Sequence, residues 1–179
     1  MTVTLNHRKI LTRGRVFDLV RDDITLSNGE RTAMEVVRHP GAAGIVAMPD
    51  PQHVLLVHQY RYPLDTHIWE IPAGTLNKDE APLSCARREL EEETGFRGGR
   101  WHAIGDITPV PGYSDERIHL FLATDLSAGQ QHLDADEMLS VRSVEWAQML
   151  EMIEKGEVKD AKSISAVYLA ERYLSRIKD

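Results

Sequence analysis

GTLNKDEAPLSCARRELEEETGF occupies residues 74–96 of this chain. Gly74 is followed after five residues by Glu80, and after seven more by RELEEETGF at 88–96. The stretch fits the pattern G-x5-E-x7-R-E-U-x-E-E-x-G-U, in which U is a bulky apolar residue. At average residue usage, chance would produce this pattern in a chain of this length on the order of once in ten million. We therefore take it as the segment that decides the fold.

The second half of this stretch is typical of a helix. Pro82 suits the first helical turn, where its missing N–H costs nothing, and Gly95 suits the position after the last turn, where φ becomes positive. Between them Leu83, Ala86 and Leu90 recur at spacings of three and four, so they share one apolar face. We expect a helix between Pro82 and Gly95 that packs through this face.

Three glutamates gather on another face of the same helix. Glu89, Glu92 and Glu93 are three and four residues apart, so their carboxylates repel one another unless a cation neutralises them. Arg88 can pair with Glu92, which leaves Glu89 and Glu93 without an obvious partner in the helix. An acidic run is more often a solvated face, but the spacing from Glu80 and the flanking glycines favours metal ligands. Hard cations such as Mg²⁺ prefer such oxygen ligands and bridge to substrate phosphates.

Composition narrows the class of protein. The 179 residues suit one domain with a sizeable core, and a net charge of −7 disfavours a general nucleic-acid surface. The single cysteine, Cys85, precludes an intramolecular disulfide and is expected to be an inert packed thiol. No apolar run has the length of a signal peptide or a membrane span. We expect a cytoplasmic protein with no nucleic-acid or membrane partner.

Apolar runs and turn residues divide the chain further. Asn28-Gly29 predicts a hairpin, and residues 1–38 read as a small antiparallel β-meander that precedes the main domain at 39–179. In the main domain we expect strands at 42–48, 53–60, 69–74, 101–107 and 117–123, and helices at 146–155 and 161–177. Strands interleaved with helices favour an α/β fold, a mixed sheet between helices.

The 74–96 pattern resembles the Nudix box, with no position missing. The resemblance implies a Nudix-type α/β/α sandwich and a hydrolase of nucleoside diphosphates linked to another group. Four further segments resemble the ADP-ribose pyrophosphatase subgroup. They are MEVVRHPGA at 34–42, HQYRYP at 58–63, WEIPAG at 69–74 and PGYSDE at 111–116, whose Pro111 falls fifteen residues after Phe96.

The resemblance also implies roles for individual residues. The metal ligands would be the backbone carbonyl of Ala73 and the side chains of Glu89, Glu92 and Glu93. The substrate-binding residues would be Arg61, Glu70 and Arg38. The catalytic residues would be Glu137, Glu92 and Arg88. Glu137, in LDADEML at 133–139, is the predicted general base, while Asp134 and Asp136 beside it are equally well read as solvated turn residues.

The predicted reaction is Mg²⁺-dependent cleavage of ADP-ribose to AMP and ribose 5-phosphate, with Mn²⁺ as an alternative metal. Two other readings are a hydrolase of another nucleoside diphosphate sugar, such as GDP-mannose, and a non-catalytic ADP-ribose sensor. An acyl-transfer hydrolase is disfavoured because Ser114 and Ser163 lie outside any G-x-S-x-G motif and read as loop and helix-surface serines. The resemblance implies a homodimer, and a meander too small to hold a core alone agrees with it.

Overall fold

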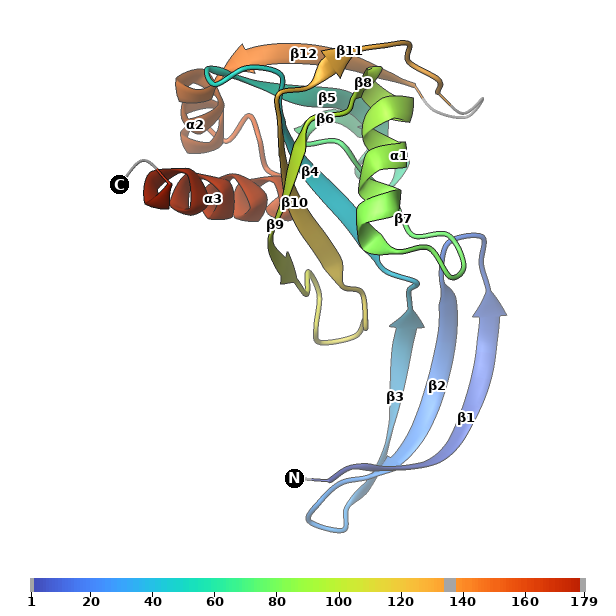
Figure 1. The fold of residues 1–179 in the computed structure, drawn as a ribbon. Coiled ribbons are helices and arrows are strands. Elements are labelled where there is room, and N and C mark those ends of the chain that lie inside the picture. The colour runs from blue at the N-terminus through green and yellow to red at the C-terminus, as the bar shows by residue number, and fades with distance from the viewer. Residues whose placement is uncertain (1, 134–137, 178–179) are drawn as a thin grey trace. The chain divides into compact units, whose positions relative to one another are not determined.

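The computed structural model describes residues 2–133 and 138–177, which form two compact units (Figure 1). The first unit contains residues up to Gly41 together with the segment Thr108–Arg117, and the second contains the rest of the described chain. Within the described residues, no helix has the length and apolarity needed to cross a membrane.

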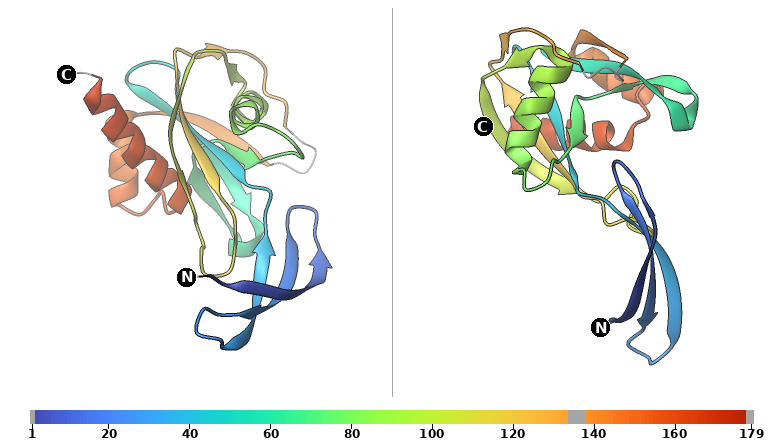
Figure 2. Two further views of the ribbon diagram at one scale, coloured as in Figure 1. Left: turned by 60° about the horizontal axis from the view of Figure 1, so that its bottom comes forward. Right: turned by 90° about the vertical axis from the view of Figure 1, so that its right-hand side faces the viewer.

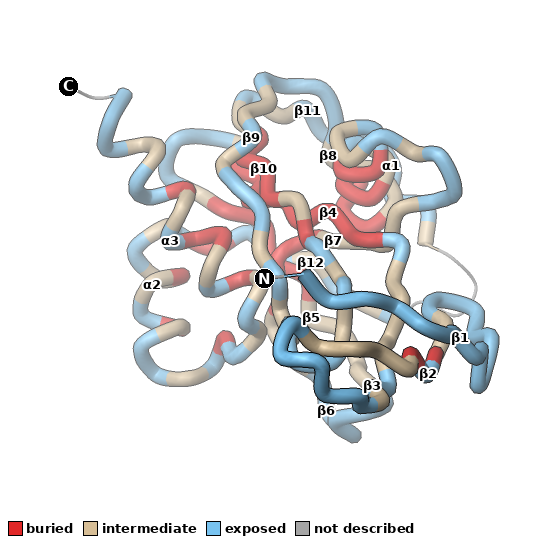
Figure 3. Tube along the Cα trace, turned by 90° about the horizontal axis from the view of Figure 1, so that it is seen from below, coloured by how far each residue is buried: buried red, intermediate tan, exposed pale blue. Residues whose placement is uncertain are grey.

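The first unit is built on a three-stranded antiparallel sheet. Its strands are, in order, β1 (Thr4–Arg13), β2 (Asp18–Thr25) and β3 (Arg31–Arg38). The predicted hairpin turn is confirmed, because Gly29 has φ of 86° and its N–H donates to the carbonyl of Leu26 at 2.9 Å. Every residue of β1 is exposed (Figure 3). This sheet thus has little core of its own.

The second unit contains the predicted mixed sheet. Its strands are, in order, β7 (Ala73–Thr75), β4 (Ala42–Met48), β10 (Ile118–Thr124) and β9 (Arg100–Ile107). Strands β4 and β10 run parallel, and the other neighbours are antiparallel. An antiparallel sheet stands beside it, formed by β12 (Leu139–Glu145), β5 (His53–Arg61) and β6 (Thr66–Glu70). Three short elements complete the strands and turns: η1 (Tyr62–Leu64), β8 (Phe96–Arg97) and β11 (Ser127–Ala128).

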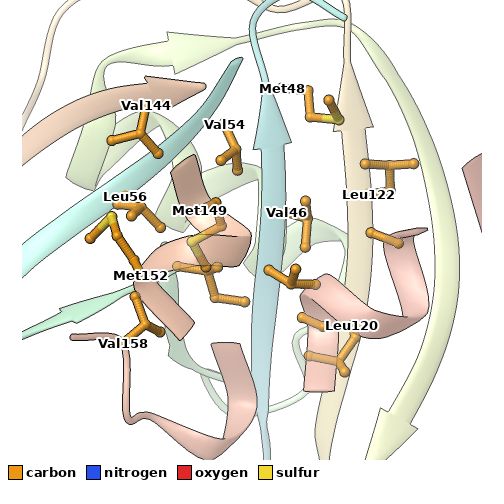
Figure 4. Packing of buried hydrophobic residues seen from close by; sticks show 14 of the residues in the cluster. Val46, Met48, Val54, Leu56, Leu120, Leu122, Val144, Met149, Met152 and Val158 are labelled. Atoms are coloured by element: carbon orange, nitrogen blue, oxygen red, sulfur yellow. The ribbon is translucent and has the colours of Figure 1, made fainter. Parts of the chain in front are cut away.

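Helices cover both faces of the mixed sheet. α1 (Pro82–Thr94) lies on one side, and α2 (Trp146–Glu154) and α3 (Ala161–Arg176) lie on the other (Figures 1 and 2). All seven residues of β4 are buried and alternate between two clusters, as a strand covered on both faces requires. Ala43, Ile45 and Ala47 pack with α1, whereas Val46 and Met48 pack with residues of α2 and α3 (Figure 4).

The expected strands at 42–48, 53–60, 101–107 and 117–123 and the two C-terminal helices are confirmed to within one residue at each end. The expected strand at 69–74 is wrong. β6 ends at Glu70 and β7 begins at Ala73, in a different sheet. Pro72 stands between them and has no N–H to donate to a ladder, although its carbonyl accepts from Ile45 N at 2.9 Å. The break places Ala73 at the start of a strand beside α1.

Candidate active site

The helix α1 presents the acidic residues of the 74–96 stretch. It begins at Pro82 after an extended Ala81, and it ends at Gly95, whose φ of 72° lies in the left-handed region. The Gly95 N–H donates to the carbonyl of Glu91 at 2.9 Å, which closes the last turn. The predicted signals at the two ends of the helix, Pro82 and Gly95, are both confirmed. Glu89, Glu92 and Glu93 therefore lie within one continuous helix.

Two of these glutamates are buried against strand β7. Glu93 is 3% exposed, and its Oε2 accepts a hydrogen bond from the backbone N–H of Ala73 at 3.0 Å. Glu89 is 8% exposed and its carboxyl group lies directly over Gly74, where a Cβ would overlap it. Gly74 is thus needed for the close approach of a carboxylate rather than for a positive φ. The strand and the helix together surround two buried acids.

Arg88 gathers three carboxylates around one guanidinium. Its Nε and Nη2 donate to the two oxygens of Glu80 at 3.0 and 2.9 Å. Its Nη1 donates to Glu89 at 2.6 Å and to Glu92 at 3.0 Å. These hydrogen bonds, that from Glu80 foremost, raise the pKa of Arg88, and Arg88 in turn lowers the pKa of Glu80. The expectation that Glu89 lacks a partner in the helix is therefore wrong, because a neighbouring arginine can bend back to reach it.

Arg61 and Glu70 form a second charged group on the β5–β6 hairpin. Arg61 Nε and Nη2 both donate to Glu70 Oε2, at 3.0 and 2.6 Å. Among the described residues Nη1 of Arg61 has no hydrogen-bond partner. The other Glu70 oxygen accepts from Lys162 Nζ of α3 at 3.0 Å. The structure thus brings the two predicted substrate-binding residues of this unit into one ion pair.

Arg38 lies in the first unit. Its Nη1 donates to Asp115 at 2.9 Å and its Nη2 to Asp22 at 2.8 Å. Asp22 also accepts two hydrogen bonds from Arg8, which together with Arg38 lower its pKa to about 2. Both terminal nitrogens of Arg38 are therefore engaged within its own unit, and its contact with substrate stays a prediction. The predicted base Glu137 lies outside the described residues, with Asp134 and Asp136.

Comparison with known proteins identifies the family of the chain. The NUDIX domain matches residues 38–167. The chain belongs to the Nudix family. It is 42% identical to an ADP-ribose pyrophosphatase of Bacillus subtilis (strain 168), over 86% of this chain and 84% of that protein. It is 33% identical to a GDP-mannose pyrophosphatase of Salmonella choleraesuis (strain SC-B67), over 91% of this chain and 92% of that one.

A solved structure shares the fold. It is a crystal structure of an ADP compounds hydrolase, 23% identical in sequence, with a TM-score of 0.85 over 98% of this chain and 95% of that chain. The predicted α/β/α sandwich with a separate antiparallel N-terminal sheet is therefore confirmed for this Nudix hydrolase.

Nudix ADP-ribose pyrophosphatases generally depend on a divalent metal, and the residues of this chain fit one. Glu89 and Glu93 are buried carboxylates, the type of ligand that hard cations take, and Gly74 leaves room for one of them. In the described part of the chain no group of three Asp, Glu, His or Cys side chains is already arranged to hold a metal ion. Arg88 holds two of the glutamates, so metal binding would exchange some of these hydrogen bonds for metal–oxygen contacts.

Sequence reasoning missed three residues at the start of α3. Asp160 is the N-cap, Lys162 reaches Glu70, and Ser163 contacts Ile71. The interpretation of Ser163 as a helix-surface serine is wrong, because it is fully buried. An aspartate directly before a helix is a recognisable N-cap signal, but nothing in the local sequence connects Asp160 to residues 70 and 71. By contrast Cys85 is buried as expected, and burial raises the pKa of its thiol to about 12.

Proposed function

We propose that this Nudix hydrolase cleaves ADP-ribose to AMP and ribose 5-phosphate with Mg²⁺ as its metal. The observation that carries the proposal is the placement of the buried Glu89 and Glu93 against β7, beside the predicted carbonyl ligand of Ala73. The likeness to a B. subtilis protein named ADP-ribose pyrophosphatase, over most of both chains, supports the choice of substrate.

Four residues would hold the metal: the carbonyl of Ala73 and the carboxylates of Glu89, Glu92 and Glu93. A bound divalent cation neutralises the pyrophosphate and lowers the pKa of a bound water. Arg88 contributes by holding Glu89 and Glu92 in place through its Nη1. In this proposal Arg88 is a positioning residue, because its nitrogens are already engaged by Glu80, Glu89 and Glu92.

Phosphate binding and proton transfer use other side chains. Arg61 is oriented by two hydrogen bonds to Glu70, which leaves Nη1 to donate to a substrate phosphate oxygen. Water attacks one phosphorus, its proton passes to the predicted base Glu137, and the P–O bond of the bridge breaks. A general base of this kind contributes about a hundred- to ten-thousand-fold in rate.

A second candidate substrate is GDP-mannose. The 33% identity to GDP-mannose pyrophosphatases, over nearly the whole of both chains, is the observation that favours it. The proposed metal site and the proposed bond cleavage are the same for both substrates, so the difference lies in the contacts to the base and the sugar.

Product analysis tests the proposal. The protein is incubated with Mg²⁺ and, in separate tubes, with ADP-ribose, GDP-mannose or ADP-glucose, and the products are separated by chromatography. We expect AMP and ribose 5-phosphate to form fastest from ADP-ribose, and Glu93→Gln to form both at least about a hundredfold more slowly. Faster cleavage of GDP-mannose would refute ADP-ribose as the preferred substrate and support GDP-mannose. If the folded protein cleaves none of the three compounds, the proposed hydrolysis is refuted.

We further propose that the N-terminal sheet pairs with a second copy of the chain, so that the protein is a homodimer. The first unit exposes several large apolar side chains: Leu5, Ile10 and Leu11 of β1, Met34 of β3, and Phe17 just before β2. Several exposed large apolar side chains on one small unit favour an interaction surface. Sedimentation equilibrium should give twice the chain mass, and Leu5→Lys with Leu11→Lys should shift it toward one chain mass. A wild-type monomer at micromolar concentration would refute the dimer.

We also propose that the protein works in the cytoplasm.

A further inference from the structure

The first turn of α3 is bound to the segment that leads into strand β7. Ser163 is fully buried, and its Oγ accepts a hydrogen bond from the backbone N–H of Ile71 at 2.9 Å. The same Oγ donates to Asp160 Oδ2 at 2.6 Å, and the Ser163 N–H donates to that oxygen at 2.9 Å. The N-cap of the helix therefore orients the hydroxyl that holds Ile71.

A buried ion pair makes the second connection. Lys162 Nζ lies 3.0 Å from Glu70 Oε1 and 3.0 Å from Asp160 Oδ2. The Lys162 side chain is 11% exposed and that of Glu70 is 4% exposed, so water screens this contact little. Arg61 takes the other oxygen of Glu70. The four charges balance in pairs, which is the condition under which buried charges are tolerated.

Each residue of the segment 70–73 thereby has a hydrogen bond or ion pair to one of three elements, α3, β4 or α1. Glu70 is held by Lys162 and Ile71 by Ser163, both from α3. The carbonyl of Pro72 accepts from Ile45 of β4, and Ala73 N–H donates to Glu93 of α1. Proline at 72 restricts its own φ and the conformation of Ile71, so a shift at Ile71 is passed on to Ala73.

From these contacts we infer that Lys162 and Ser163 are positioning residues for the metal site. They hold the segment 70–73 in the position from which the Ala73 carbonyl can bind a metal together with the carboxylates of α1. This inference rests on the proposed function, because the metal role of Ala73 is part of it. Removing a residue that orients a metal ligand typically weakens metal binding about 10- to 100-fold.

The test is a Mn²⁺ titration of the full chain, without substrate, followed by the EPR signal of the free ion. We expect Ser163→Ala and Lys162→Met to raise the dissociation constant at least about tenfold, and Lys162→Arg to restore most of the affinity. Matched controls are Ser165→Ala, on the same helix, and Lys159→Met, just before it. Among the described residues neither side chain makes a hydrogen bond or ion pair, and both variants should bind Mn²⁺ as the wild type does.

The outcomes are separable. If Lys162 and Ser163 only stabilise packing, the variants will melt at a lower temperature but keep the wild-type Mn²⁺ dissociation constant, which overturns the inference. If Ser163→Ala does not fold, the Mn²⁺ dissociation constants of Lys162→Met and Lys162→Arg are compared instead. Equal, wild-type constants in both overturn the inference. A wild type that binds Mn²⁺ but does not cleave ADP-ribose overturns the proposed substrate alone. A wild type that binds no Mn²⁺ overturns both.

Discussion

Two groups of charged residues in this molecule differ in how their charges are matched. In the N-terminal unit the buried Asp22 faces two arginines, Arg8 and Arg38, and Arg38 is shared with Asp115. Two arginines therefore meet two carboxylates. On α1 a single guanidinium, that of Arg88, is hydrogen-bonded to three carboxylates, and the buried Glu93 lies beside them.

This difference in charge balance distinguishes the Asp22 group, an ion network that supports the fold, from the Arg88 group, whose excess of carboxylates favours a cation. Charges that balance one another leave little affinity for an added cation, and removing one partner destabilises the fold because the other charge is left without compensation. Several carboxylates that share one guanidinium repel one another, and a divalent cation relieves that repulsion while taking the oxygen ligands it prefers. We therefore expect substitutions in the first group to change stability, and substitutions in the second to change metal binding and activity.

The largest effect should come from Glu93→Gln. The amide can still accept the hydrogen bond from Ala73 N–H, but it lacks the charge that a metal ligand supplies. We expect kcat/KM for ADP-ribose to fall at least about a hundredfold while the melting temperature stays near that of the wild type. Steady-state kinetics and thermal unfolding measure the two. Retained activity would show that Glu93 is a structural residue like Asp22.

Asp22→Asn should show the opposite pattern. It leaves Arg8 and Arg38 without the carboxylate that pairs them, so the free energy of unfolding should fall by roughly 1.5–3 kcal/mol. The Mg²⁺ concentration that gives half-maximal activity should not change. Urea denaturation and a Mg²⁺ titration of activity measure these quantities. A large change in the metal requirement would contradict the division between the two groups.

The loss of stability in Asp22→Asn should depend on pH. Hydrogen bonds from Arg8, then from Arg38, lower the pKa of Asp22 from 3.8 to about 2, although burial opposes the shift. A carboxylate with a lowered pKa stabilises the folded state above its unfolded pKa and loses this effect as the pH falls toward its folded pKa. The difference in unfolding free energy between wild type and Asp22→Asn should be constant above about pH 5 and shrink as the pH falls toward 2. A difference that persists unchanged at the lower pH would contradict the assignment.

Gly74→Ala tests the close approach within the α1 group. The new Cβ would overlap the Glu89 carboxyl and displace it, so we expect kcat/KM to fall about tenfold. The loss should not add to that of Glu89→Gln, because both act on the same carboxylate. Kinetics of the two single variants and the double variant form the test. Strict additivity would mean that Gly74 acts through something other than Glu89.

The smallest effect should come from an exposed pair that belongs to neither group. Glu151 of α2 and Lys155, the C-cap of that helix, lie 2.7 Å apart, and both side chains are 58% exposed. Solvent screens such a pair, so Lys155→Met should leave the unfolding free energy unchanged within the error of the measurement. Urea denaturation checks this against Asp22→Asn. An equal loss in both variants would mean that burial does not separate them.

What the sequence predicted correctly was local. The helix between Pro82 and Gly95, the hairpin at Asn28-Gly29 and the fully apolar β4 each follow from neighbouring residues, and the structure confirms them. The 69–74 strand was wrong because one proline outweighed the apolar residues around it. Strand β12 was not predicted at all, although LSVRSVE alternates apolar and polar residues over most of its length.

What it could not predict depends on contacts between distant segments. Ser163 and Ile71 are 92 residues apart, and so are Lys162 and Glu70. The charge pairing within the motif could not be predicted for the same reason. The motif contains Glu80 and Arg88, but their bidentate contact depends on the turn between β7 and α1. The pairing of Thr108–Arg117 with the N-terminal sheet through Arg38 and Asp115 likewise joins residues 77 positions apart.

The most direct test of the difference between the two charged groups is the amount of Mn²⁺ bound at equilibrium dialysis by three proteins: wild type, Glu93→Gln and Asp22→Asn. We expect wild type and Asp22→Asn to bind the ion with the same stoichiometry and affinity, and Glu93→Gln to bind it at least about tenfold more weakly. Equal binding by wild type and Glu93→Gln, or a loss confined to Asp22→Asn, would contradict this expectation.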